Sequence, residues 1–154
     1  MKKRPEKTAQ TKAAPIAAFW AIYKETPISK ITVKAVTDGA GLFRSTFYLY
    51  SPDVYAILEL IEHEILSAWE AMASSLSAHG QQALLIGPIT DFYENYGEQL
   101  SVLLSPMGDP MFQRKIKDAM RPKMFSLLQV PDDDAEAALI FEFILSAMLG
   151  FLTE

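Results

Sequence analysis

Four side chains suited to nucleic-acid contacts lie within five consecutive positions: Arg44, Ser45, Thr46 and Tyr48. An arginine can donate paired hydrogen bonds to the edge of guanine, and hydroxyl groups bond to base edges or to phosphate oxygens. Phe47 lies between them and is expected to face a small core. The segment is therefore a candidate for a helix that contacts DNA.

The elements that must position this segment can be read from apolar spacing and caps. A first amphipathic helix, ended by Pro27, is predicted from apolar residues at three- and four-residue spacing: Ile16, Phe19, Trp20 and Tyr23. Thr32 is placed to cap a second helix, which the Gly39–Gly41 turn ends, and residues 42–50 continue as a third helix. Residues 1 to about 8 lack periodicity and are expected to form a mobile arm. Three short helices with a glycine-containing turn are typical of a helix-turn-helix domain.

The charge differs in sign between the two parts of the chain. Residues 1–51 carry nine Lys and Arg against three Asp and Glu, a net charge of +6, whereas residues 52–154 carry five against sixteen, a net charge of −11. A basic first third on an acidic remainder favours a head that binds a polyanion and a body that does not. A solvated basic face is the alternative.

The remainder of the chain predicts further helices and no strand. Ser51 and Pro52 are expected to open a long helix that ends near Ala78, with one apolar stripe: Ile57, Leu60, Ile61, Ile65, Leu66, Trp69 and Met72. Further helical segments are expected at 84–96, 98–104 and 111–129, and from residue 135 onward. The predicted fold class is all-α, with a helix-turn-helix domain at 1–51 and a helical ligand-binding or dimerisation domain at 52–154.

Other chemistry finds little support in the sequence. The chain has 154 residues and no cysteine, which removes disulfides, thiol catalysis and cysteine-ligated metals and fits a cytoplasmic protein. His63 lies in Glu-His-Glu, but the metalloprotease pattern would need a histidine at Ser67. Three acids at 132–134 could hold a hard cation, although an acidic helix start explains them better. We expect no metal site, no cofactor, no enzyme activity and no membrane span.

At this point the sequence resembles a known family. Residues 28–66, ISKITVKAVTDGAGLFRSTFYLYSPDVYAILELIEHEIL, are similar to the DNA-binding domain and first linker helix of TetR/AcrR transcriptional regulators, and ITVKAV, AG and RSTFY carry the likeness. The resemblance implies a dimer that binds a pseudo-palindromic operator. The contacts it implies involve base edges and phosphates: Thr32, Lys34, Arg44, Ser45, Thr46, Tyr48 and Tyr50.

Three positions depart from the family pattern. Phe43 stands at the usual serine cap of the recognition helix, Leu49 where a basic residue is frequent, and Val54 where a lysine commonly contacts phosphate. Each lost phosphate contact weakens DNA binding. An alternative function is therefore a protein-interaction module that keeps the helix-turn-helix fold with little affinity for DNA.

The second part of the chain resembles the family more loosely. Residues 95–120 are similar to a subgroup that includes dihydroxyacetone-kinase-type regulators, in which a protein partner can replace a small ligand. Aromatic residues of this part are candidates to line a pocket for a small apolar ligand, with a simple core role as the alternative: Trp69, Phe92, Tyr93, Tyr96, Phe112 and Phe125. A homodimer interface is expected on the final helix: Phe141, Leu145, Met148, Leu149 and Leu152. The family's last two helices form the dimer bundle, and this sequence ends within or just after the first of them, as either a truncated product or an incomplete sequence would.

Overall fold

The computed structural model describes residues 5–78 and 86–152, and this part of the chain contains helices and no strand. The all-α prediction is confirmed. The contact pattern divides the chain into two compact units, 1–61 and 62–154, so the division falls inside a helix and not after residue 51. No helix among the described residues is long and apolar enough to cross a membrane.

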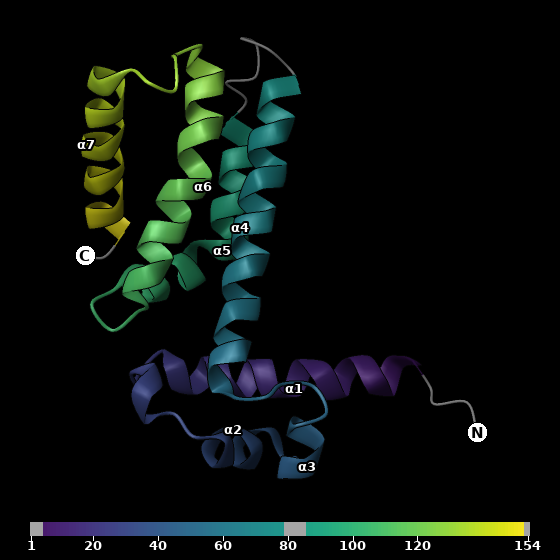
Figure 1. The fold of residues 1–154 in the computed structure, drawn as a ribbon. Helices are drawn as coiled ribbons and strands as arrows, with labels where there is room; N and C mark the ends of the chain where they lie inside the picture. Colours follow the sequence, from purple (N-terminus) through teal and green to yellow (C-terminus); the bar gives the residue numbers. More distant parts are fainter. Residues whose placement is uncertain (1–4, 79–85, 153–154) are drawn as a thin grey trace. The chain divides into compact units, whose positions relative to one another are not determined.

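The first unit is built from α-helices and one 3-10 helix (Figure 1). Its elements are α1 (Pro5–Tyr23), the 3-10 helix η1 (Ile28–Lys30), α2 (Val33–Ala40), α3 (Arg44–Phe47) and the start of α4 (Val54–Ala78). Helix α1 packs on α2, and α2 packs on α3. Phe19, Val36 and Phe47 are fully buried between them. Burying this apolar surface stabilises helices that are too short to be stable alone.

The prediction of a mobile arm was wrong for residues 5–8, because α1 begins at Pro5. Proline is favoured at the first helical position, where its missing N–H would have had no partner in any case. Residues 1–4, the rest of the predicted arm, lie outside the described residues.

The second unit contains the rest of α4, then α5 (Ile86–Leu104), α6 (Pro110–Leu128) and α7 (Ala135–Leu152). Helix α5 contacts both α6 and α7, and Figure 1 shows α6 and α7 side by side. The core of this unit consists of apolar side chains from all four helices: Ile65, Trp69, Leu100, Leu103, Leu104, Phe112, Ile116, Phe125, Phe141 and Leu145.

Two details of α4 correct the sequence analysis. The cap is Asp53 and not Ser51, because Asp53 Oδ1 accepts a hydrogen bond from the backbone N–H of Ala56 at 2.9 Å. Leu60, assigned to the apolar stripe, is half exposed, whereas Leu58 and Glu62 are buried. The buried face of α4 is therefore rotated from the predicted stripe by about one position on this part of the helix.

Candidate nucleic-acid interface and regulatory unit

Helix α2 is fixed at both ends by local interactions. Thr32 Oγ1 accepts a hydrogen bond from Ala35 N at 3.1 Å, which confirms the predicted cap. Gly41 ends the helix in the left-handed conformation with φ 63°, and Leu42 N then bonds to Thr37 O at 2.9 Å. A residue with a side chain is strained at such a φ, so glycine is needed at this turn. The turn sets the direction in which α3 leaves α2.

Helix α3 is a single turn, Arg44–Phe47, and is shorter than the predicted helix at 42–50. Phe43 occupies its N-cap position and makes no capping side-chain hydrogen bond, as expected from the sequence. The segment is held in place by Phe47, which is fully buried and meets the Tyr48 ring edge-on at 5.6 Å between centroids. Phe47 therefore anchors α3 while its neighbours remain available to solvent.

The predicted DNA-contacting residues are placed as follows. Arg44, Ser45 and Tyr48 are exposed on or directly after α3, whereas Thr46 and Tyr50 are half-buried. Arg44 forms no ion pair with any residue that the structure describes. The side chains on α3 are thus presented together, with one cationic group uncompensated.

The candidate contact residues at α2 already make interactions within the protomer, unlike Arg44 on α3. Lys34 Nζ lies 2.6 Å from Asp38 Oδ2, one turn later on the same helix, and both side chains are largely exposed. The hydroxyl of Thr32 already accepts the capping hydrogen bond but keeps its own proton to donate. Val54 is buried at the start of α4 and cannot serve as a phosphate contact.

Comparison with solved structures identifies the fold. The structure described as a TetR transcriptional regulator from Streptococcus agalactiae 2603V superposes with a TM-score of 0.66 at 21% identity, covering 96% of this chain and 83% of that chain. The chain has the fold of a TetR transcriptional regulator. No family model and no curated protein matches the sequence. The comparisons give no support to the narrower likeness of residues 95–120 to dihydroxyacetone-kinase-type regulators.

In this TetR-like fold the second unit contains a buried carboxylate that the sequence analysis missed. Glu62 on α4 is 1% exposed, and its Oε2 lies 2.6 Å from Lys115 Nζ on α6. Among the described residues no donor reaches the other oxygen, Oε1. Burial raises the pKa of Glu62 above its usual value, Lys115 opposes that rise, and the carboxylate of Asp109 adds to it. Glu62 follows Leu58 by four residues and precedes Ile65 by three, so helical spacing could have placed it on the buried face.

The predicted pocket aromatics lie on α4, α5 and α6 and differ in burial. Trp69, Phe112 and Phe125 are buried in the core, Phe92 and Tyr96 form a ring pair at 5.4 Å, and Tyr93 is exposed. An apolar cleft of about 240 Å³ lies between α6 and α7, and Phe125 is the one member of the predicted set that lines it. Its other lining residues are aliphatic, aromatic or thioether side chains: Met120, Met124, Leu128, Val130, Ala137, Ile140, Phe141, Ile144 and Leu145.

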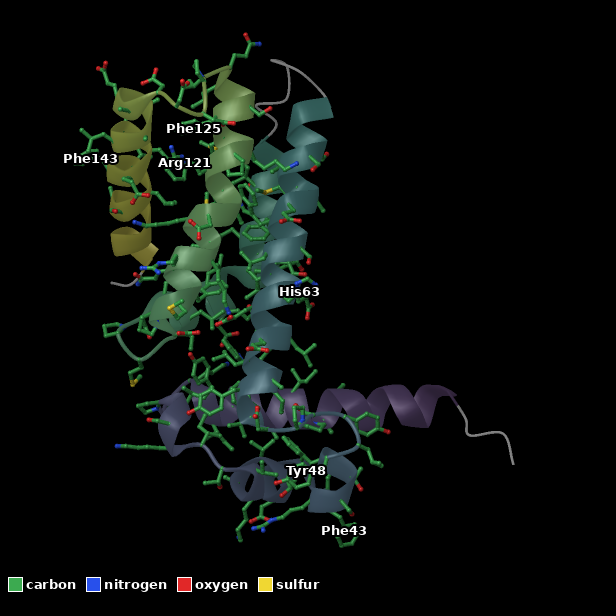
Figure 2. All side chains as sticks on the ribbon, in the orientation of Figure 1. Phe43, Tyr48, His63, Arg121, Phe125 and Phe143 are labelled. Carbon is green, nitrogen blue, oxygen red and sulfur yellow. The ribbon has the colours of Figure 1, made fainter. Side chains whose placement is uncertain are left out.

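Helix α7 has a buried face and an exposed apolar face. Phe141 and Leu145, both predicted for the dimer interface, are buried within the protomer, where Phe141 meets Phe125 edge-on at 5.9 Å. Leu139 and Phe143 are 73% and 76% exposed, and Figure 2 shows Phe143 pointing away from α6. The side chains of Met148, Leu149 and Leu152 lie outside the described residues.

The remaining candidates from the sequence have simpler roles. Asp134 caps α7, with Oδ1 accepting from Glu136 N and Ala137 N at 3.0 Å each. His63 is exposed on α4 (Figure 2). No group of three or more potential ligand residues that could hold a metal ion occurs at 5–78 and 86–152.

Proposed function

We propose that the protein is a dimeric transcriptional regulator that binds a pseudo-palindromic DNA operator through its first unit. The observation that carries the proposal is the presentation of Arg44, Ser45 and Tyr48 on α3, which Phe47 anchors to the core. In helix-turn-helix proteins the second of the two helices enters the major groove and its first residues meet the bases. The net charge of +6 on residues 1–51 adds long-range attraction to DNA.

Each predicted contact then has a separate role. Arg44 reads bases, with Ser45 and Thr46 beside it, because a guanidinium can bond to guanine O6 and N7 at once. Tyr48, Thr32 and Tyr50 donate to phosphate oxygens. Lys34 turns from Asp38 to a phosphate, at little cost because an exposed ion pair contributes only about 0–1 kcal/mol.

The test is duplex binding by fluorescence anisotropy at several salt concentrations, with a site selected from random sequence. We expect log K to fall with log salt by roughly 0.9 for each phosphate contacted. Arg44→Ala should cost about 1–3 kcal/mol and relax base preference, whereas Tyr48→Phe should weaken all duplexes alike. Arg114→Ala, in the second unit, is the control and should change neither the affinity for DNA nor the base preference. Equal, small effects at Arg44 and Tyr48 would contradict the assigned roles.

A protein-interaction module is the second candidate, and three observations favour it. Val54 is buried where the family pattern has a phosphate-binding lysine, Lys34 is paired with Asp38, and Phe43 and Leu49 expose apolar surface beside α3. The absence of duplex binding even at low salt would favour this module over the regulator.

We place the dimer interface on the exposed face of α7. Leu139 and Phe143 are one turn apart and share this face with no cover from their own protomer. Aspartate at both positions should give a folded monomer in sedimentation velocity and weaken operator binding, since two linked heads bind more tightly than one. Ile89→Asp, at a half-exposed position on α5, should leave the dimer intact. A dimer that survives the double substitution places the interface elsewhere.

We further propose that the α6–α7 cleft is where a small apolar ligand acts. At about 240 Å³ it lies below the usual size of a ligand site and has no polar lining, so a compact hydrocarbon ring suits it best. Indole is a convenient probe. Its addition should shift the methyl NMR signals of Met120 and Met124, and Ala137→Leu, which fills the cleft, should abolish the shifts. Ala135→Leu, at an exposed position on α7, should leave them unchanged, and unshifted signals at saturating indole would refute the site.

A further inference from the structure

Phe43 is an exposed aromatic residue at the edge of the candidate DNA interface. Its side chain is 83% exposed, the largest exposed fraction among the large hydrophobic residues that the structure describes. The backbone is extended there, with φ −76° and ψ 147°, and places the ring at the start of α3. Figure 2 shows Phe43 projecting outward from this end of the first unit.

The fold of the protomer does not explain a phenylalanine at this position. The ring contributes nothing to the core, and Phe43 makes no capping hydrogen bond to α3. A serine, threonine, asparagine or aspartate would satisfy a free N–H of the helix and would also be more soluble. The residue therefore sacrifices local stability and leaves apolar surface in water, which points to a contact made with another molecule.

The neighbours of Phe43 indicate what that molecule is. Arg44 follows directly, is exposed and has no ion pair among the described residues, and Ser45 and Tyr48 complete a surface of cationic and hydroxyl groups. An apolar protein surface would leave the guanidinium without a partner. The major groove instead offers acceptors for arginine and one apolar group, the 5-methyl of thymine.

Resting on the proposed function, we propose that Phe43 reads a thymine methyl group in the major groove, beside the base that Arg44 contacts. Consecutive Cα atoms are about 3.8 Å apart, close to the roughly 3.4 Å rise of one base pair, so neighbouring residues can reach neighbouring base pairs. Arginine favours guanine, and a phenyl ring packs against the thymine methyl. Each half-site should therefore contain a thymine within one base step of a guanine.

Deoxyuridine tests this assignment because it pairs as thymine does and lacks only the methyl group. The experiment takes the full chain and its selected duplex, replaces each thymine in turn by deoxyuridine, and measures affinity by fluorescence anisotropy. One position per half-site should lose about fourfold in affinity, the factor that follows from the transfer free energy of one buried methyl group. Replacement of the symmetric pair should lose about sixteenfold, the product of the two single effects.

Substitutions assign the effect to the phenyl ring. Phe43→Ala should erase the sensitivity to deoxyuridine at that position while preserving the salt dependence, and Phe43→Leu should retain part of it. Leu49→Ala, which removes an apolar side chain that is 75% exposed nearby, should leave the deoxyuridine profile unchanged. Thermal melting by circular dichroism shows that each variant is folded.

The outcomes separate this proposal from the proposed function. If the unmodified chain binds no duplex, DNA binding itself fails. If it binds DNA but no deoxyuridine position matters, or Phe43→Ala keeps the sensitivity, DNA binding stands and the role of Phe43 is refuted. A change in DNA bending with Phe43→Ala, without loss of methyl discrimination, would mark Phe43 as a wedge between bases and would likewise refute it.

Discussion

The buried pair of Glu62 and Lys115 should make stability depend on pH. Glu62 is almost completely inaccessible, and its Oε2 is 2.6 Å from Lys115 Nζ. Lys115→Met removes the cation and leaves the carboxylate in an apolar environment. Breaking a buried pair in this way costs about 3–5 kcal/mol, and we expect the lower end because the Lys115 side chain is 41% exposed and solvent screens the pair.

The free energy of unfolding that Lys115→Met removes should grow with pH, because the pKa of Glu62 is raised in the folded protein. Burial raises the pKa of Glu62 above its usual value, so the folded protein holds this proton at pH values where the unfolded chain has released it. Stability from this group is complete below the unfolded pKa and is lost as pH rises through the folded pKa. Lys115 lowers the pKa of Glu62, so Lys115→Met raises the folded pKa and extends the pH range over which stability is lost. Within this range the free energy of unfolding falls by at most about 1.4 kcal/mol per pH unit.

Urea denaturation followed by circular dichroism, at pH 5 to 8, measures this dependence. Lys115→Met should be destabilised more at pH 8 than at pH 5, because protonation of Glu62 as the pH falls removes the uncompensated charge. In a Glu62→Gln background the same substitution should cost little at any pH. Lys117→Met is the matched control, because Lys117 makes an equally short bond to the half-exposed Glu142 and should contribute only about 0–1 kcal/mol. An equal loss at pH 5 and pH 8 would show that the charge of Glu62 is not responsible.

Three further predictions concern the same two units. Phe43→Ser supplies the missing cap of α3 and should raise the free energy of unfolding by about 1 kcal/mol. A decrease relative to the unmodified chain would show that the phenyl ring stabilises the fold. Gly108→Ala should destabilise the protein in thermal melts, because a Cβ there would lie 1.9 Å from the backbone oxygen of Leu103, whereas Gly87→Ala, with open space around it, should be neutral or stabilising. Leu145→Ala should cost about 2–5 kcal/mol of protomer stability in urea melts and Phe143→Ala little, and the reverse order would exchange the buried and exposed faces of α7.

Features set by neighbouring residues were predictable from the sequence. The Thr32 cap and the turn at Gly41 follow from contacts within one or two turns of the chain. Phe47 is an apolar residue between polar ones, so it could be assigned to the core, although packing between helices completes its burial. The N-terminal motif also carries the likeness to TetR regulators, and the fold comparison confirms that fold. Local chemistry determines these features, so a single sequence is sufficient to read them.

Features set by packing between distant segments were not predictable in the same way. The partner of Glu62 is 53 residues away on α6, and nothing local to α4 indicates it. Helix α7 is apolar on nearly every face, so its sequence does not show that Phe141 and Leu145 turn inward while Leu139 and Phe143 remain exposed. The cleft between α6 and α7 was also not predictable. Each helix can be predicted from the sequence, but the residues that line the cleft depend on how the two helices are rotated relative to each other.

The presentation of α3 depends more on its anchors than on its own helical stability. One helical turn without a side-chain cap has almost no intrinsic stability, since forming the first turn costs more conformational entropy than one hydrogen bond returns. Phe47 in the core and the Gly41 turn must therefore hold Arg44 and Phe43 in position. The exposed residues of α3 can therefore change with little effect on the fold, because the residues that we propose to read bases are separate from those that support the backbone. This separation explains how an uncapped position can carry an aromatic side chain, and why specificity and stability should respond in opposite directions to Phe43→Ser.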